Sequence, residues 1–345
     1  MEPDAPRLDA PGRTSETGAA LLTVLLLIAI LSVITAVALE RLTIASRMTR
    51  NIVSADQGRA YLFTAEQLAA TRIGDLVAMR PDRTTLQGGW LGRDQIIPVP
   101  GGSVTARIID RGNCFNLNSL VQGPEKDEGD DVSSLTARPD AIAQFAGLMR
   151  LLGVDHGLAL SIATSAADWI DSDAIPGNGG AEDDYYSQFD PPYRTANGLM
   201  ADPSELLMVN AVTPDVYQRV RPWLCALPTT RLSPININTL LPGQAVLLAM
   251  LAPEVLGIDQ ARQVLAQRPV GGYGSVVTFW MQPAMQRISP SLPDSVKEQL
   301  QQKTRWFEVA LRADLGGDEV EETVLFDAET KAVRLVRRQW GEGDS

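Results

Sequence analysis

The sequence predicts an α+β protein in which a long N-terminal transmembrane helix leads into an antiparallel sheet that carries a large inserted α-helical domain. Residues 19–39 form an apolar run without a charged side chain. Residues 104–110 and 307–312 alternate between apolar and polar side chains, which is typical of half-buried strands. The chain between these strands shows helical spacing of apolar residues and many loop-forming residues, so we expect a helical insertion.

Residues 19–39 are interpreted as a single transmembrane helix. At roughly 1.5 Å per residue, a run of this length crosses the hydrocarbon core once, and only Thr23, Ser32 and Thr35 in it are polar. A secretory signal peptide would have a shorter apolar core followed by a cleavage site with small residues. A buried helix of a globular domain is rarely apolar on every face. A membrane anchor is therefore favoured over both alternatives.

The helical pattern continues beyond the membrane, so we expect an amphipathic extension to about residue 79. Its apolar positions are Ala60, Phe63, Leu68, Ile73 and Val77. Residues 80–118 and 304–345 are assigned to a β-domain, and residues 119–303 to the inserted helical domain.

Turn residues predict the order of the C-terminal strands. Gly316-Gly317 predicts a hairpin turn between the strand at 307–312 and a strand over 320–327. Residues 332–337 predict a third strand.

The composition excludes several classes of site. The 345 residues include 30 Lys and Arg against 42 Asp and Glu, which gives a net charge of −12. Nucleic acid is not an expected partner, because phosphate contacts need clustered basic side chains. Two Cys and the single His156 rule out a four-thiolate zinc site and a His-rich metal site. A Ser-His-Asp triad would have to use His156.

An acidic segment of the insertion, residues 168–190, is the main candidate site. It contains no Lys or Arg, so its carboxylates repel one another unless a cation holds them together. Its glycines permit tight turns, and its aromatic side chains are costly to leave in water. Oxygen ligands without His favour Ca²⁺ over zinc or copper. Two alternatives stay open: a solvated acidic face, and paired carboxylates for acid–base catalysis as in a glycosidase.

Residues 235–280 resemble helix-hairpin-helix modules, with Asn236 to Thr239 capping a helix and a Gly-rich turn at 271–274. Some such modules bind DNA phosphate. The nearby basic residues are only Arg262 and Arg268, so packing against a partner or forming core is the expected use.

Several motifs together resemble the K-type minor pseudopilins of type II secretion systems, which have a type IV pilin-like fold. Gly18 is followed by AALLTVLLLIAI, then by Glu40-Arg41-Leu42 and Ala55-Asp56-Gln57. The run DWIDSD…GAEDDYY…YRTAN…PSELLMV is similar to a block of that family. The matches cover most of the chain. They imply a pilin-like sheet packed on the N-terminal helix, with the helical domain inserted.

The resemblance implies processing of the N-terminus. Residues 1–18 would be a prepilin leader, which a prepilin peptidase removes after Gly18 before methylating Ala19. Most pilins carry Glu five residues into the mature chain, where it pairs with the amine of a neighbouring subunit; here that position is Thr23. An unpaired carboxylate in hydrocarbon is costly. Thr23 therefore fits a subunit at the tip of the fibre, which has no neighbour above it.

The resemblance also implies ligands and a disulfide. Members of the family bind two calcium ions in the helical domain, and we expect both here as structural cofactors. The matching ligand positions are Asp168, Asp171, Asp173, Glu182, Asp183 and Asn197, with Asp184 and Glu205 as second-rank candidates. Cys114 and Cys225 follow the membrane helix, which in this family places them in the oxidising periplasm, where two Cys commonly pair. Two buried free thiols are the alternative.

The implied function is non-enzymatic. A single-pass protein of the bacterial inner membrane, with its globular part in the periplasm, would cap the pseudopilus tip, initiate assembly and support export of folded proteins across the outer membrane. Expected partners are the I, J and H types of minor pseudopilin, the pseudopilus, the prepilin peptidase and inner-membrane lipid, with the secretin and exported proteins as further candidates. The alternatives are a pilin-like tip protein of type IV pili or DNA uptake, and a membrane-anchored hydrolase.

Overall fold

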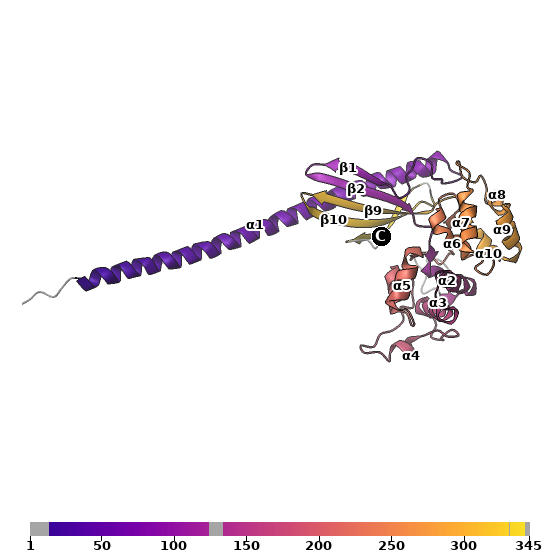
Figure 1. Ribbon diagram of the computed structural model, residues 1–345, viewed down its shortest axis with the longest axis horizontal. Coiled ribbons are helices and arrows are strands. Elements are labelled where there is room, and N and C mark those ends of the chain that lie inside the picture. Colours follow the sequence, from indigo (N-terminus) through magenta and orange to yellow (C-terminus); the bar gives the residue numbers. More distant parts are fainter. Residues whose placement is uncertain (1–13, 124–133, 331, 342–345) are drawn as a thin grey trace, which may run out of the picture.

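A computed structural model describes residues 14–123, 134–330 and 332–341. Helix α1 (Thr14–Met79) is 66 residues long and projects from the globular part as a rod (Figure 1). Its most apolar window has a mean hydropathy of 2.9 and none of it is buried, which makes α1 the one membrane-span candidate among the described residues. The helix is continuous to Met79, where the predicted extension ends. Residues 1–13 of the expected leader lie outside the described ranges.

The sheet has five strands in the order β1-β2-β9-β10-β11, and all neighbouring pairs are antiparallel. The strands are β1 (Asp94–Val99), β2 (Gly102–Asp110), β9 (Trp306–Leu315), β10 (Asp318–Asp327) and β11 (Arg334–Trp340). The four predicted strands are present, and Gly316 and Gly317 form the β9–β10 turn with positive φ angles. Strand β1 was not predicted, because DQIIPV lacks a clear alternation and contains Pro98.

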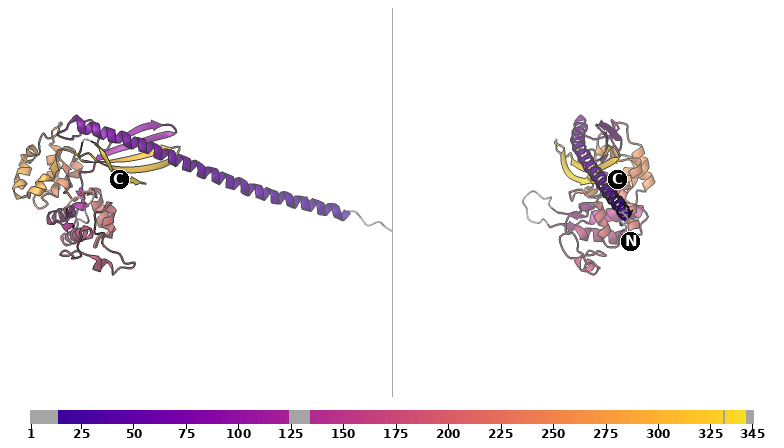
Figure 2. Two further views of the ribbon diagram at one scale, coloured as in Figure 1. Left: turned by 180° about the vertical axis from the view of Figure 1, so that it is seen from behind. Right: turned by 90° about the vertical axis from the view of Figure 1, so that its left-hand side faces the viewer.

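The C-terminal part of α1 packs on one face of this sheet (Figure 2). Leu62, Ala65, Ala69 and Ile73 are buried at helical spacing against alternating residues of the strands, such as Val309 on β9. The prediction of which apolar side chains of α1 face the sheet was partly wrong. Phe63 and Leu68 are 44% and 48% exposed, so the buried stripe lies to one side of them.

The chain between β2 and β9 forms the helical region. Its α-helices are α2 (Pro139–Leu151), α3 (His156–Ile170), α4 (Asp183–Tyr186), α5 (Pro214–Val220), α6 (Ala245–Ala249), α7 (Ile258–Ala266), α8 (Val276–Trp280), α9 (Pro283–Ile288) and α10 (Asp294–Glu298). One continuous hydrophobic core runs through them. The region lies at the end of the molecule remote from the start of α1, with α6–α10 beyond the sheet and α2–α5 to one side of the sheet's far end (Figure 1).

Two lobes make up the helical region, and each is closed by a short parallel strand pair. The first lobe (residues 115–225) pairs β3 (Phe115–Asn116) with β6 (Leu224–Cys225), and also contains the antiparallel pair β4 (Val121–Gln122) and β5 (Thr136–Ala137). The second lobe (residues 235–301) pairs β7 (Ile235–Asn236) with β8 (Leu300–Gln301).

The lobes begin with the same motif, FNLNSL at residue 115 and ININTL at residue 235. The side-chain amide of the second Asn in each motif forms hydrogen bonds with both the backbone N–H and the backbone carbonyl of one distant residue. Asn118 donates to the Met200 carbonyl at 2.9 Å and accepts from its N–H at 2.7 Å. Asn238 does the same with Tyr273, at 3.2 and 2.6 Å. The motif therefore connects the start of each lobe to a residue far along the same lobe. This role of the motif was not predicted from the sequence.

Cys114 and Cys225 form a disulfide, as predicted, with 5.8 Å between their Cα atoms. Both are buried beside Leu227, Trp306 and Leu325. The bond thus joins the two ends of the first lobe next to the sheet.

Candidate metal centre

The acidic segment begins in the last turn of α3. Asp155 caps the start of this helix by accepting N–H bonds from Gly157 and Leu158, and Asp171 follows its last residue. A Gly-containing loop then leads from Asp171 into α4, so that the carboxylates of the helix end face those before α4.

Asp171, Asp173 and Glu182 each bring one carboxylate oxygen within 4.8 Å of the others. Asp171 and Glu182 are 3% and 4% exposed, and one carboxylate oxygen of each has no hydrogen-bond partner. Burying an unpartnered charged oxygen is costly unless a cation compensates it. All donors are carboxylate oxygens, the type that Ca²⁺ prefers. The three residues therefore fit a calcium ion.

Electrostatics in this cluster point the same way. Burial, reinforced by the charges of Asp173 and Asp168, raises the pKa of the Asp171 carboxyl to about 7. Burial and the neighbouring Asp171 raise the pKa of Glu182 to about 7. Both carboxylates are thus held where their negative form is disfavoured without a cation.

Asp168, the first predicted ligand, does not belong to that set of oxygens. Its carboxylate accepts backbone N–H bonds from Gly177 and Ala181 instead. The position was identified from the sequence, but its contacts are with backbone amides.

Asp183 and Asn197 are linked through Thr195. Asp183 Oδ1 accepts from the Thr195 N–H at 3.0 Å and from its hydroxyl at 2.8 Å, and these bonds lower the pKa of Asp183. The Thr195 hydroxyl also lies 2.9 Å from Asn197 Oδ1, and Asn197 has a φ of 47°. Sequence reasoning missed Thr195, although YRTAN was noted. Asp183 is not one of the three clustered carboxylates, but it directly follows Glu182 and its charge contributes to the raised pKa of Glu182.

The second-rank candidates have other contacts. Glu205 accepts N–H bonds from Ala201 and Asp202 and forms a capping box at the start of the 3-10 helix Pro203–Met208. Asp184 is exposed, and its backbone carbonyl accepts from the side chains of Ser187 and Gln188.

Aromatic side chains hold the acidic segment against the rest of the first lobe. Tyr186 is fully buried, lies edge-on to Trp169 with ring centroids 5.4 Å apart, and its hydroxyl accepts from the Asn210 N–H at 3.0 Å. Tyr193 packs on both rings. The segment is consequently ordered, as its aromatic content indicated.

The segment that resembles helix-hairpin-helix modules is part of the core. Helix α6 is buried throughout, and Arg268 donates to the Leu240 carbonyl at 2.6 Å. One of the two basic residues nearby is therefore used inside the lobe.

Comparisons with known proteins agree on one family. The family described as "Type II secretion system (T2SS), protein K" matches residues 113–229 and 235–301. A type II secretion system protein K of Pectobacterium carotovorum subsp. carotovorum is 34% identical over 329 residues, covering 95% of this chain and 98% of the relative. The protein K of Aeromonas hydrophila is 34% identical over 333 residues, with the same coverage.

A solved structure shares the fold. One chain of the GspK-GspI-GspJ complex from the enterotoxigenic Escherichia coli type 2 secretion system aligns with a TM-score of 0.72 and 29% identity. The alignment covers 86% of the present chain and 99% of that chain.

Proposed function

The chain belongs to the type II secretion system protein K family, and from that premise we propose that it caps the tip of the pseudopilus, initiates pseudopilus assembly and supports export of folded proteins across the outer membrane. It acts as a structural subunit without enzymatic activity, anchored once in the bacterial inner membrane with its globular part in the periplasm. The observation that carries the tip position is the place of the two helical lobes at the end of the molecule remote from the start of α1, with the second lobe beyond the sheet and the first lobe to one side of the sheet's far end (Figure 1). Their bulk leaves little room for a subunit above.

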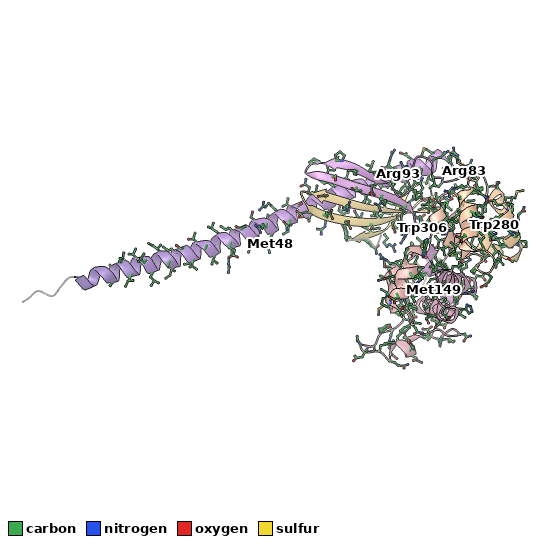
Figure 3. All side chains as sticks on the ribbon, in the orientation of Figure 1. Met48, Arg83, Arg93, Met149, Trp280 and Trp306 are labelled. Carbon is green, nitrogen blue, oxygen red and sulfur yellow. A yellow bond between two sulfur atoms is a disulfide. The ribbon has the colours of Figure 1, made fainter. Side chains whose placement is uncertain are left out.

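Partner subunits are expected along α1. Apolar side chains continue past the membrane segment to the sheet and are largely exposed, for example Met48 and Ile52, each 62% exposed. Figure 3 shows Met48 on the part of α1 that projects away from the globular body. Outside lipid, such a stripe needs covering by other apolar helices. The relative named in the GspK-GspI-GspJ complex supports I- and J-type pseudopilins as partners; the H type, secretin and exported proteins are further proposed contacts.

The N-terminus is proposed to mature by removal of residues 1–18 by the prepilin peptidase and methylation of Ala19. A Cβ at Gly18 would meet no atom within 4 Å. Replacement of Gly18 would thus act on recognition by the peptidase, and leave packing unchanged.

Two structural calcium ions are proposed for the first lobe. Asp171, Asp173 and Glu182 would hold one, and Asp183 with Asn197 would contribute to the second. The bound cations would offset the repulsion between buried carboxylates and so stabilise the lobe, since ligands that bind only the folded state raise its stability.

Thr23→Glu tests the tip position. The Thr23 hydroxyl donates to the Ala20 carbonyl at 2.8 Å, so the wild-type side chain needs no partner from another subunit. A glutamate there would be an unpaired carboxylate in hydrocarbon at the tip. We expect a several-fold loss of secretion and of pseudopilus initiation, with Thr23→Ser as the unaffected control. Wild-type secretion and assembly order in Thr23→Glu would contradict the tip assignment.

A further inference from the structure

Asp168 occupies the inner side of the acidic segment. The side chain leaves the last turn of α3 and the residue is 2% exposed. The Gly177 N–H lies 3.1 Å from both carboxylate oxygens, and the Ala181 N–H lies 2.9 Å from Oδ2. Backbone amides therefore satisfy this carboxylate, whereas Asp171 and Glu182 each keep an unpartnered oxygen.

These contacts close the loop that carries Glu182. Ala181 directly precedes Glu182, and Asp168 and Asp171 lie one helical turn apart at the end of α3. Within the loop, the Gly180 N–H donates to the Gly177 carbonyl at 2.9 Å. The hydrogen bond from the Ala181 N–H to Asp168 consequently fixes the backbone position of Glu182 relative to Asp171.

The glycines of the loop are required by this approach. A Cβ on Gly180 would lie 1.8 Å from Asp168 Oδ2. A Cβ on Gly177 would lie 2.5 Å from Thr164 Cγ2 and 3.1 Å from Asp168 Oδ1. Both positions need glycine because the backbone lies directly on the carboxylate.

We infer that Asp168 is a positioning residue that holds the 177–181 loop closed and thereby sets Glu182 against Asp171, and that it is not a ligand of the ion. This inference rests on the proposed calcium site. It assigns a different role to a residue whose motif position indicated a ligand.

The first test compares Asp168→Asn with Asp171→Asn in the full chain in detergent, with exposed Asp184→Asn as a charge-matched control. In EGTA, Asp168→Asn should lower the melting temperature, because its amide group would face a backbone N–H. Asp171→Asn should leave it unchanged or raise it, because a repulsive buried carboxylate is removed. Calorimetric titration with Ca²⁺ should show at least roughly tenfold weaker binding in Asp168→Asn, as for groups that orient metal ligands.

The second test separates positioning from ligation by hydration of the bound ion. Tb³⁺ luminescence, sensitised by neighbouring Trp169, reports coordinated waters through lifetimes in H₂O and D₂O. Asp171→Asn should gain about one water, as expected when one ligand of an oxygen-coordinated ion is lost, whereas saturated Asp168→Asn should keep the wild-type number. A gained water in Asp168→Asn, together with wild-type melting in EGTA, would overturn the inference.

Failure of the metal proposal is recognisable separately. A wild-type chain that binds neither Ca²⁺ nor Tb³⁺ would contradict the calcium site. Hydrogen exchange in EGTA then decides the loop-closing role. Faster exchange of the Gly177 and Ala181 amides in Asp168→Asn supports it, and unchanged exchange overturns it.

Discussion

At the scale of residues, the acidic segment combines two kinds of carboxylate. Asp168 and Asp183 accept several hydrogen bonds from the protein. Asp171 and Glu182 are about as buried as Asp168 and more buried than Asp183, but each has an oxygen without a donor. Hydrogen bonds to carboxylates of the first kind favour the charged form, although burial still raises the pKa of Asp168. Those of the second kind have an oxygen without such a bond and need a proton or a cation.

Calcium removal should therefore destabilise the protein. Chelation with EGTA at neutral pH should lower the melting temperature of the wild-type chain by several degrees, because the loss of a folded-state ligand lowers stability. Readdition of Ca²⁺ should restore it, and Mg²⁺ should restore it less, since Mg²⁺ demands a stricter geometry. A melting temperature that EGTA leaves unchanged would contradict the calcium proposal.

Asp110 should make stability depend on pH. Its buried carboxyl accepts hydroxyl bonds from Thr239 and Thr304, yet burial raises its pKa from 3.8 to about 6. Between these values the folded state binds the proton more strongly, so stability falls as pH rises from about 4 to 6, by at most ~3 kcal/mol.

The matched variant for that prediction is Asp110→Asn, which cannot ionise. Urea unfolding at pH 4 and pH 7 should show that wild type loses stability relative to Asp110→Asn over this range. Parallel pH profiles of the two proteins would contradict the assignment to Asp110.

The candidate site could be predicted in part from residue type and spacing. An excess of carboxylates without Lys or Arg located the segment, and the structure brings Asp171, Asp173 and Glu182 together. The role of Asp168 could not be predicted, because it depends on loop amides that approach only in the folded chain. Thr195 is uncharged, so the excess of carboxylates in the sequence did not point to it.

At the scale of elements, α1 is attached to the sheet by an apolar stripe and by one buried ionic group. Arg338 on β11 lies 2.6 Å from Glu66 of α1 and 2.7 Å from Glu322 of β10. Glu66 and Glu322 are 2% and 1% exposed. Burial and the charge of Glu66 raise the pKa of Glu322, so the two carboxylates depend on the guanidinium between them.

Arg338→Ala should thus weaken the attachment of α1. It leaves two buried carboxylates without their cation, which should lower the free energy of unfolding by about 3 kcal/mol. Arg334→Ala is the control, because Arg334 is exposed and its partner Asp327 retains Arg305, and it should cost less than about 1 kcal/mol. Equal losses in denaturant unfolding would argue against the buried group.

Elements with strong periodicity could be predicted from the sequence, and those fixed by tertiary contacts could not. The alternation of β2 and β9 reflects one face packed on α1. Strand β1 forms because its neighbour β2 offers a free edge, which outweighs Pro98. The two lobes depend on the paired amides of Asn118 and Asn238, and the repeated Asn-x-Asn motif was the available signal.

At the scale of the whole molecule, the sheet joins the long helix α1 to a head made of the two helical lobes. The disulfide closes the first lobe across a sequence separation of 111 residues. Arg337 on β11 donates to the carbonyls of Ala201 and Ala226, so the edge of the sheet also holds this lobe. The head is consequently fixed to the sheet at several points, as a cap that blocks further subunits would require.

Site-specific photo-crosslinking tests the tip-capping role most directly. A photoreactive amino acid is placed at Ile52 on α1 or at Val270 between α7 and α8, which are 62% and 98% exposed. In assembled pseudopili, the first position reports contacts along α1 and the second reports contacts of the second lobe. The proposed function predicts crosslinks from Ile52 to other minor pseudopilins and none from Val270 to any pseudopilin. Crosslinks from Val270 to a pseudopilin as efficient as those from Ile52 would contradict it.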